Sequence, residues 1–404
     1  MLPLAIRAYT ATTALGRGRA AQAAALQARR SGLRRNDFGG DPLDCWIGRV
    51  EGLEDAALPA MWAQWECRNN RLAWLALQQD GVLEVVAAMK ARHGAERVAI
   101  VLGTSTASIG ATEEAYTRLE DGAFPQDIAQ PIVHTVHSLG DFVQHATGLR
   151  GPCVTVATAC SSSAKVFAQA SRLIEAGLAD AALVGGVDTL CGSVLFGFNA
   201  LELVSPDPCK PFDAQRRGLS LGEAGGFAVL ERIEANVDGA SIESSGLQLR
   251  GYGESSDAHH MSTPHPEGLG AQYAMRDALA RALIDAREVG YLNLHGTATP
   301  ANDRIEAHAV AKIFSGVALP DAVHASSTKG WTGHTLGAAG IVESVFALIA
   351  LEDGMLPGIL NSVTPDAACG PQIRFDNAQR DIRYAMNNSF GFGGNNCSLV
   401  FGRT

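Results

Sequence analysis

The sequence predicts an α/β fold in which buried sheets are covered by helices. Short runs of β-branched and small residues alternate with longer stretches of helical periodicity, which is the pattern of such folds. Hydrophobic residues make up 47% and charged residues 18% of the 404 residues, so the chain can bury a sizeable core. The 44 glycines imply many tight turns or close backbone contacts.

The expected elements follow one another in a regular order. Apolar and β-branched runs predict strands at 98–104, 153–158, 181–188, 247–253, 291–296, 385–390 and 396–402. Helical periodicity predicts helices at 18–31, 57–79, 162–176, 269–286, 303–314 and 337–353. The length is well above about 150 residues, so we expect two domains or one large duplicated one. The polar break at 234–246 is the expected boundary, although no internal repeat is evident by eye.

Composition and charge argue against several classes of protein. No apolar run approaches the roughly 20 residues of a membrane span, and the N-terminus has Arg7 in its apolar stretch and no signal-peptide cleavage pattern. The eight cysteines are scattered without a CxxC pair, which argues against a metal site or a disulfide framework and suits a reducing cytoplasm. The net charge of −10 argues against nonspecific nucleic-acid binding. We therefore expect a cytoplasmic protein.

Cys160 is the first candidate catalytic residue. It lies on a sharp turn between the predicted strand 153–158 and the predicted helix 162–176. Unpaired N–H groups and the helix dipole favour a thiolate at such a helix N-terminus. We expect the other seven cysteines to be small buried residues, whereas Cys160 has the context of a nucleophile.

Two histidines and a lysine lie in the second half of the chain. His295 ends a predicted strand, at the sheet edge where α/β folds place their sites. Lys329 and His334 lie in a Gly-rich loop before an apolar helix. That helix carries Glu343, a candidate counter-ion, which a buried lysine needs.

Two further features of the second half of the chain are candidates for the site. Asp303 and Glu306 begin the helix after His295, where acids commonly just complement the helix dipole. Near the C-terminus, the turn GFGG lies between two strands, and its backbone amides could form half of an oxyanion hole. Phosphate binding is a rival interpretation, but GFGG fits no P-loop spacing. One thiol, two histidines and one lysine together indicate acyl transfer to Cys160.

These fragments together resemble the β-ketoacyl-acyl-carrier-protein synthases, the condensing enzymes of fatty-acid and polyketide synthesis. The resemblance covers roughly residues 95–404, and the first 95 residues match weakly. It rests on TACSSS around Cys160, HGTATPANDRIEA after His295, STKGWTGHTLGAAG around Lys329 and NNSFGFGGNN near the end. The order Cys, His, Lys, His, with GFGG last, is highly specific.

The resemblance implies a thiolase-type fold, in which two duplicated halves form five αβαβα layers with the site between them. The halves are expected at 1–245, with the nucleophilic cysteine, and at 246–404, with the histidines and lysine. It implies acyl carrier protein as a partner and a homodimer, or a heterodimer with a related ketosynthase-like chain. No cofactor of the protein's own is expected, since the carrier protein brings phosphopantetheine with the substrate.

The resemblance also assigns the chemistry. Cys160 would carry the acyl thioester. His295 and His334 would bind the thioester carbonyl of malonyl carrier protein and stabilise the enolate left by decarboxylation. Lys329 would be a nearby charge paired with Glu343.

Supporting roles follow from the same resemblance. Glu306 would be a second partner for the lysine. The backbone N–H of Phe392 would form an oxyanion hole with that of the nucleophile, and its ring would gate access. Phe198 would lie near the acyl pocket. Arg68 and Arg71, three residues apart on one predicted helix, would dock the acidic carrier protein.

Three departures from the family pattern leave the pathway open. They are the run of three serines after the nucleophile, Arg217-Gly218-Leu219 in place of Asp-Gly-Phe, and Asn395 in place of threonine. Three alternatives are weaker. A chain-length partner subunit usually lacks the nucleophile, a thiolase needs a second catalytic cysteine, and a cysteine hydrolase would not need TGHTLGAAG. The one cysteine near GFGG, Cys397, lies in an alternating strand and fits the core.

Overall fold

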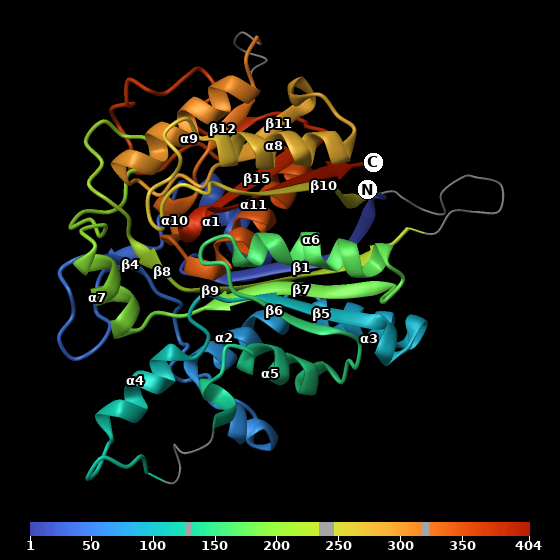
Figure 1. The fold of residues 1–404 in the computed structure, drawn as a ribbon, viewed down its shortest axis with the longest axis vertical. Coiled ribbons are helices and arrows are strands. Elements are labelled where there is room, and N and C mark those ends of the chain that lie inside the picture. Colours follow the sequence, from blue (N-terminus) through green and yellow to red (C-terminus); the bar gives the residue numbers. More distant parts are fainter. Residues whose placement is uncertain (126–130, 234–245, 317–322) are drawn as a thin grey trace.

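The two halves of the chain build sheets that join edge to edge (Figure 1). The structure is a computed structural model that describes residues 1–125, 131–233, 246–316 and 323–404. The N-terminal sheet contains β1 (Leu4–Thr13), β5 (Val98–Gly103), β6 (Cys153–Val156), β7 (Ala181–Asp188) and β9 (Ala224–Arg232). The C-terminal sheet contains β10 (Leu247–Ser256), β11 (Val289–Asn293), β12 (His324–Ser326), β15 (Tyr384–Gly391) and β16 (Asn395–Arg403).

The two sheets have the same topology. Their strand orders are β6-β5-β7-β9-β1 and β12-β11-β15-β16-β10, and each reads 3-2-4-5-1 when its strands are numbered in chain order. In both sheets the first three strands of this path pair in parallel and the last two pairings are antiparallel. The sheets meet where β1 pairs with β10, at Leu4 with Leu249 and Ala5 with Gln248. This identity of order and direction is the signature of a duplicated fold.

Helices complete the layers. Two central helices, α6 (Ser162–Glu175) and α11 (Ala339–Asp353), pack against each other and against strands of both sheets. The outer face of the N-terminal sheet is covered by α2 (Arg68–Leu77), α3 (Val82–His93) and α5 (Ser138–Thr147). The outer face of the C-terminal sheet is covered by α8 (Leu269–Ala282) and α9 (Pro300–Ile313). Figure 1 shows the resulting five layers, which confirm the predicted thiolase-type fold.

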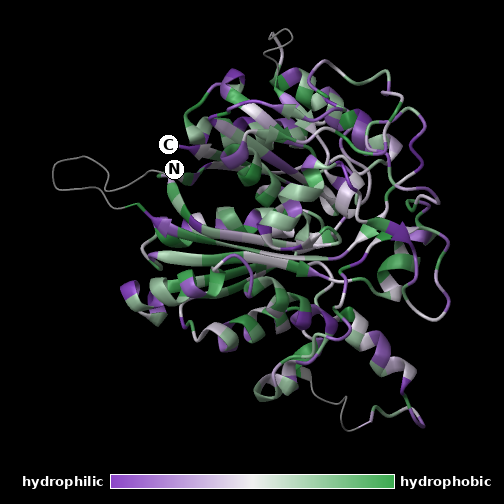
Figure 2. Cartoon of the chain, turned by 180° about the vertical axis from the view of Figure 1, so that it is seen from behind, coloured by the Kyte–Doolittle hydropathy of each residue, from purple (hydrophilic) through white to green (hydrophobic). Residues whose placement is uncertain are grey.

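The central helix α11 differs from the outer helices in its sequence. From Ala339 to Leu351, every residue of α11 is buried, because a helix that is apolar all round packs on all sides. The two helices cross closely at Gly340, where an added Cβ would lie 2.4 Å from the backbone nitrogen of Ala164. Figure 2 shows the hydrophobic residues concentrated in the sheets and these helices.

The remaining elements lie around this core. They include α1 (Gly18–Gln27), α4 (Ile109–Thr117), α7 (Gly192–Ala200), α10 (Lys329–Thr332) and the short strands β2 (Gly16–Arg17), β3 (Leu33–Arg35), β4 (Trp46–Gly48), β8 (Leu221–Gly222), β13 (Met355–Leu356) and β14 (Ala378–Gln379). In Figure 1, α4 projects away from the layers. Within the described ranges, no single helix is long and apolar enough to cross a membrane. The bent pair α2 and α3, at 77°, passes that test by length and composition only.

Most predicted elements are present with ends shifted by a few residues, but three predictions need comment. The predicted helix 57–79 is broken, because Cys67 is extended between a 3-10 turn (Ala60–Trp65) and α2. Strands β1 and β9, which are neighbours in the N-terminal sheet, were not predicted. In β9 the glycines 225 and 226 conceal the strand, and α2 and α11 pack closely on them: an added Cβ would lie 3.2 Å from Ala76 Cβ and 3.1 Å from Ile341 Cγ1, respectively. The predicted boundary between residues 245 and 246 borders segment 234–245, which lies outside the described residues, and it stays a prediction.

Candidate active site

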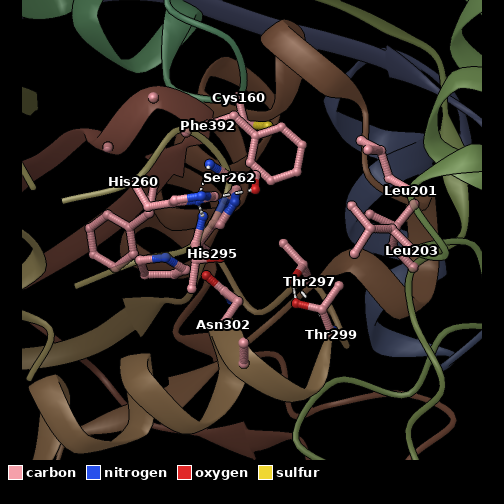
Figure 3. Close-up of a pocket in the computed structure, with 18 of the residues that line it drawn as sticks. Cys160, Leu201, Leu203, His260, Ser262, His295, Thr297, Thr299, Asn302 and Phe392 are labelled. Atoms are coloured by element: carbon pink, nitrogen blue, oxygen red, sulfur yellow. Dashed lines mark hydrogen bonds between the residues drawn. The ribbon is translucent and has the colours of Figure 1, made fainter. Parts of the chain in front are cut away.

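Cys160 lies on a strained turn between β6 and α6. Ala159 takes a positive φ of 51°, and Cys160 directly precedes the N-cap residue Ser161. The backbone therefore reverses within a few residues and places Cys160 in the wall of a cavity shared by the two halves (Figure 3). This is the strand-to-helix position that the sequence predicts.

The Cys160 thiol is neutral in the resting protein. Burial raises its pKa to about 11, although the charge of Lys329 and the backbone N–H groups of Phe392 and Cys160 lower it. The predicted stabilisation by the helix N-terminus is therefore outweighed at this site, because loss of water disfavours a charged sulfur more than the helix end favours it. The two N–H groups that act on the sulfur are nevertheless the pair predicted for the oxyanion hole.

His295 and His334 reach the same space from different elements. His295 follows β11, and His334 follows α10. Their ring centroids lie 5.4 Å apart, with the ring planes at 89°. One side-chain atom each of Cys160, His295 and His334 lies within 4.8 Å of the other two, and all three residues are buried. The fold thus assembles one thiol and two imidazoles from both halves.

The partners of the two rings determine which nitrogen carries the proton. The backbone N–H of Leu336 donates to Nδ1 of His334 at 3.1 Å. The Lys329 ammonium lies 3.5 Å from Nδ1 of His295 and can only donate. Burial and the charge of Lys329 hold the pKa of both imidazoles well below its usual range, so both are neutral. Each ring therefore offers Nε2–H as a donor.

Lys329 is held between the histidine and a carboxylate, as the sequence predicts. The lysine and Glu343 are both buried, and the Lys329 ammonium donates to Glu343 Oε1 and to the backbone carbonyl of His295. Burial raises the pKa of Glu343 to about 7, against the lowering effect of Lys329. The ammonium thus contacts the ring, the backbone and the counter-ion together.

Glu306 supports the histidine loop through the backbone. Its carboxylate accepts the N–H groups of His295 at 2.9 Å and Gly296 at 2.7 Å, and no ion pair joins it to Lys329 among the described contacts. Asp303 accepts the N–H of Ala298 at 3.1 Å in the same loop. Both acids are buried, and their hydrogen bonds to this loop give them a role beyond complementing the helix dipole. They hold the loop that carries His295.

The candidate residues open into a cavity of about 410 Å³. Cys160, His295, His334 and Phe392 all line it. The Phe392 ring stacks on Phe198 of α7, with centroids 5.9 Å apart and planes at 21°, so both predicted pocket residues lie beside the thiol's cavity. Figure 3 shows the Phe392 ring next to Cys160.

Comparison with known proteins gives the family. Residues 67–236 match the family model of the β-ketoacyl synthase N-terminal domain, and residues 247–363 match that of its C-terminal domain. The chain belongs to the β-ketoacyl synthase family. This synthase therefore catalyses the decarboxylative condensation of an acyl thioester with a malonyl thioester, in fatty-acid or polyketide synthesis.

Individual relatives cover most of both chains. Nodulation protein E of Rhizobium meliloti (strain 1021) is 35% identical over 87% of this chain and 88% of its own. The 3-oxoacyl-[acyl-carrier-protein] synthase 2 of Staphylococcus aureus is 35% identical over 76% of this chain and 77% of its own. The ketosynthase ApeO of Xenorhabdus doucetiae, solved with its chain length factor ApeC, is 36% identical with a TM-score of 0.88, covering 100% of this chain and 98% of its own.

Part of the polar lining of the cavity in this synthase was not predicted from the sequence. The Thr297 and Thr299 hydroxyls lie 2.9 Å apart, and His260 and Ser262 face the same cavity (Figure 3). The threonines lie in the fragment HGTATP, and a pair of hydroxyls beside a strand-end histidine was the available signal. The loop with His260 has no comparable signal, because only the fold brings it to the site.

The predicted docking arginines of the synthase are engaged in internal contacts. Arg68 donates to both oxygens of the fully buried Glu223, at 2.9 and 2.6 Å. Arg71 pairs with Glu66 and donates to the Glu54 carbonyl at 2.7 Å. These contacts favour a structural role, and docking through the two arginines stays a prediction.

Cys160, His295 and His334 are also the one cluster of potential metal ligands in the described part of the chain. Both Nε2 atoms carry protons, because both Nδ1 atoms accept hydrogen bonds. A metal ion requires a lone pair at the ligating nitrogen, and the Lys329 charge repels a cation. The geometry therefore suits an oxyanion better than a metal.

Proposed function

We propose that Cys160 carries the acyl group in this β-ketoacyl synthase. The thiol attacks the acyl thioester of a carrier protein, so that a new carbon–sulfur bond forms on Cys160 and the old one breaks. The carrier-protein thiol leaves with the proton that Cys160 gives up. The N–H groups of Cys160 and Phe392 stabilise the oxyanion of this step. Their joint effect on the Cys160 thiol supports the assignment.

The observation that carries the proposal is the pair of neutral imidazoles with Nε2–H directed to one buried space. In a malonyl thioester, the bond to the carboxylate breaks, CO₂ leaves and the electron pair moves onto the thioester oxygen. That enolate oxygen can accept two hydrogen bonds, one from each imidazole of His295 and His334. Lys329 keeps the His295 proton on Nε2 by occupying Nδ1.

The enolate carbon then attacks the acyl carbonyl on Cys160. The carbon–carbon bond forms, the bond to sulfur breaks, and the sulfur regains a proton from water. The product is a 3-ketoacyl thioester on the carrier protein. The hydroxyls of Thr297 and Thr299 line the route to Cys160 and are suited to hydrogen bonds with the amides of a phosphopantetheine arm.

Isotope release tests these roles. Wild type, Cys160→Ala and His334→Ala are given carboxyl-labelled malonyl carrier protein, with and without an acyl primer. Cys160→Ala is expected to release CO₂ without condensing, because both donors remain. His334→Ala is expected to lose about 10²-fold or more in CO₂ release, the scale of one lost oxyanion donor. Normal condensation by either variant would refute the assignment.

A dimer is the assembly that we propose. The edge strand β6 is only partly buried, and apolar side chains are exposed around α4, namely Ile109, Tyr116, Leu119, Phe124 and Val136. An exposed apolar patch and an unpaired strand edge each suit a protein partner. A second copy is the expected occupant, and the ApeO relative, solved with its chain length factor, makes a related chain the alternative. Sedimentation of the purified chain distinguishes a dimer from a monomer that needs another subunit.

A further inference from the structure

Asp188 is a buried carboxylate with no role in the scheme above. It ends β7, is 0% exposed, and forms no ion pair with a described residue. A lone buried carboxylate is costly unless hydrogen bonds satisfy it. The hydrogen-bond partners of Asp188 therefore indicate its role.

Every partner of Asp188 among the described residues is a neutral donor. Oδ1 accepts the hydroxyls of Thr104 at 2.6 Å and Thr106 at 2.7 Å, and the backbone N–H of Thr106 at 3.0 Å. Oδ2 accepts the N–H of Ser105 at 2.9 Å and its hydroxyl at 2.7 Å. Oδ2 also accepts the N–H of Gly337 at 2.6 Å. One carboxylate thus joins the 104–106 loop of the N-terminal half to a turn of the C-terminal half.

That turn is the one that orients His334. Gly337 directly follows Leu336, whose N–H donates to Nδ1 of His334. Leu336 has a positive φ of 57°, which is strained for a residue with a side chain, so the turn needs external support. A Cβ at Gly337 would lie 2.6 Å from Asp188 Oδ2, so the contact leaves no spare room. A shift of Gly337 would move the N–H that sets the His334 ring.

We propose that Asp188 is a positioning residue for His334: by holding Gly337, it keeps the Leu336 N–H on Nδ1 and the Nε2–H directed at the enolate oxygen. This inference rests on the proposed role of His334. Ser105 is a second member of the device, because its hydroxyl also lies 3.2 Å from the Gly337 nitrogen.

A double-mutant cycle on CO₂ release tests the proposal. The proteins are wild type, Asp188→Asn, His334→Ala and the double variant, each given malonyl carrier protein. Asn keeps the size of Asp188 but replaces one acceptor oxygen by a donor, so one of the two sets of contacts is lost. We expect kcat for decarboxylation to fall about 10- to 100-fold in Asp188→Asn, since small misplacements of a catalytic group have effects of that size. KM and the rate of Cys160 acylation should change less than about twofold.

The decisive result is the effect of Asp188→Asn when His334 is absent. If Asp188 acts only through His334, the substitution lowers the rate less than about twofold in the His334→Ala protein. An equal loss in both backgrounds would overturn the proposal, since it would reflect general disruption. Normal CO₂ release by His334→Ala would overturn the proposed role of His334. If His334→Ala slows CO₂ release but Asp188→Asn does not, only the proposed role of Asp188 is overturned.

Two further variants keep the test sound. Glu231→Gln makes the same carboxylate-to-amide change at a buried position on β9 that pairs with Arg7 and His93, away from the cavity, and should leave the decarboxylation rate unchanged. Ser105 is exposed, so Ser105→Ala is a milder change, and this variant is used if the Asp188→Asn protein does not fold. It should lower CO₂ release by about threefold, and only when His334 is present. A rate equal to that of wild type would overturn the proposal.

Discussion

Replacing Lys329 by methionine tests the buried charge pair behind the site. Lys329 is 1% exposed and Glu343 is 3% exposed, and the ammonium is the only described partner of the carboxylate. Lys329→Met keeps the volume of the side chain but leaves Glu343 with no cation. The folded protein then responds by holding a proton on Glu343.

The size of the effect depends on pH. Burial already raises the pKa of Glu343 from 4.5 to about 7 while Lys329 lowers it, so removing Lys329 raises that pKa further. A carboxyl whose folded pKa exceeds its unfolded pKa binds a proton on folding, so stability falls as pH rises toward the folded pKa. Each pH unit costs about 1.4 kcal/mol. In wild type the free energy of unfolding stops falling near pH 7, the folded pKa of Glu343. In the variant it continues to fall, so the variant loses about 2 kcal/mol more than wild type between pH 7 and pH 8.5.

Urea unfolding at pH 7.0 and 8.5, followed by tryptophan fluorescence, measures this difference. The loss of the hydrogen bond to the His295 carbonyl is common to both pH values, so the comparison isolates Glu343. The matched control is Lys329→Met combined with Glu343→Gln, in which the pH-dependent part should vanish. An equal destabilisation of the single variant at both pH values, or no recovery in the double variant, would refute the reasoning.

Four shorter predictions concern the same site. In wild type, the rate of CO₂ release should not fall with a midpoint near pH 6.5 as the pH is lowered, because burial and Lys329 hold the pKa of both imidazoles well below that value. A pH–rate profile with a midpoint near pH 6.5 would contradict the role of neutral imidazoles as donors. Cys160 should be the only residue that gains an acyl mass in intact-protein and peptide mass spectrometry, and acylation elsewhere would exclude it as the sole nucleophile. Phe392→Ala should speed iodoacetamide alkylation of Cys160 several-fold by opening the cavity, while an unchanged rate would argue against a gate. Arg68→Glu should destabilise the fold by about 3 kcal/mol or more, since it leaves Glu223 buried without its cation; a stable variant with a raised KM only for carrier-protein substrates would instead support docking.

The sequence was enough to select candidate residues that the fold brings together, because the signals for them are local. Cys160 follows a strand and precedes a helix, and His295 closely follows a strand, so short-range patterns were enough to place both at a sheet edge. Lys329 and Glu343 are only 14 residues apart, in α10 and in the apolar helix α11 after it, and their pairing could be predicted because a buried lysine needs a counter-ion. The order of the four motifs then identified the family.

Tertiary structure decided what depends on residues distant in the chain. The shared 3-2-4-5-1 order was not visible as a sequence repeat, because topology depends on which strands pair and tolerates wide differences in side chains. The protonation of Cys160 depended on how much water the fold removes, which the helix-start pattern does not contain. Asp188 contacts Gly337 across 149 residues, and Arg68 contacts Glu223 across 155. Such contacts exist only once the two halves have packed, because a carboxylate has no local preference for one particular backbone N–H or guanidinium until the fold brings that donor to it.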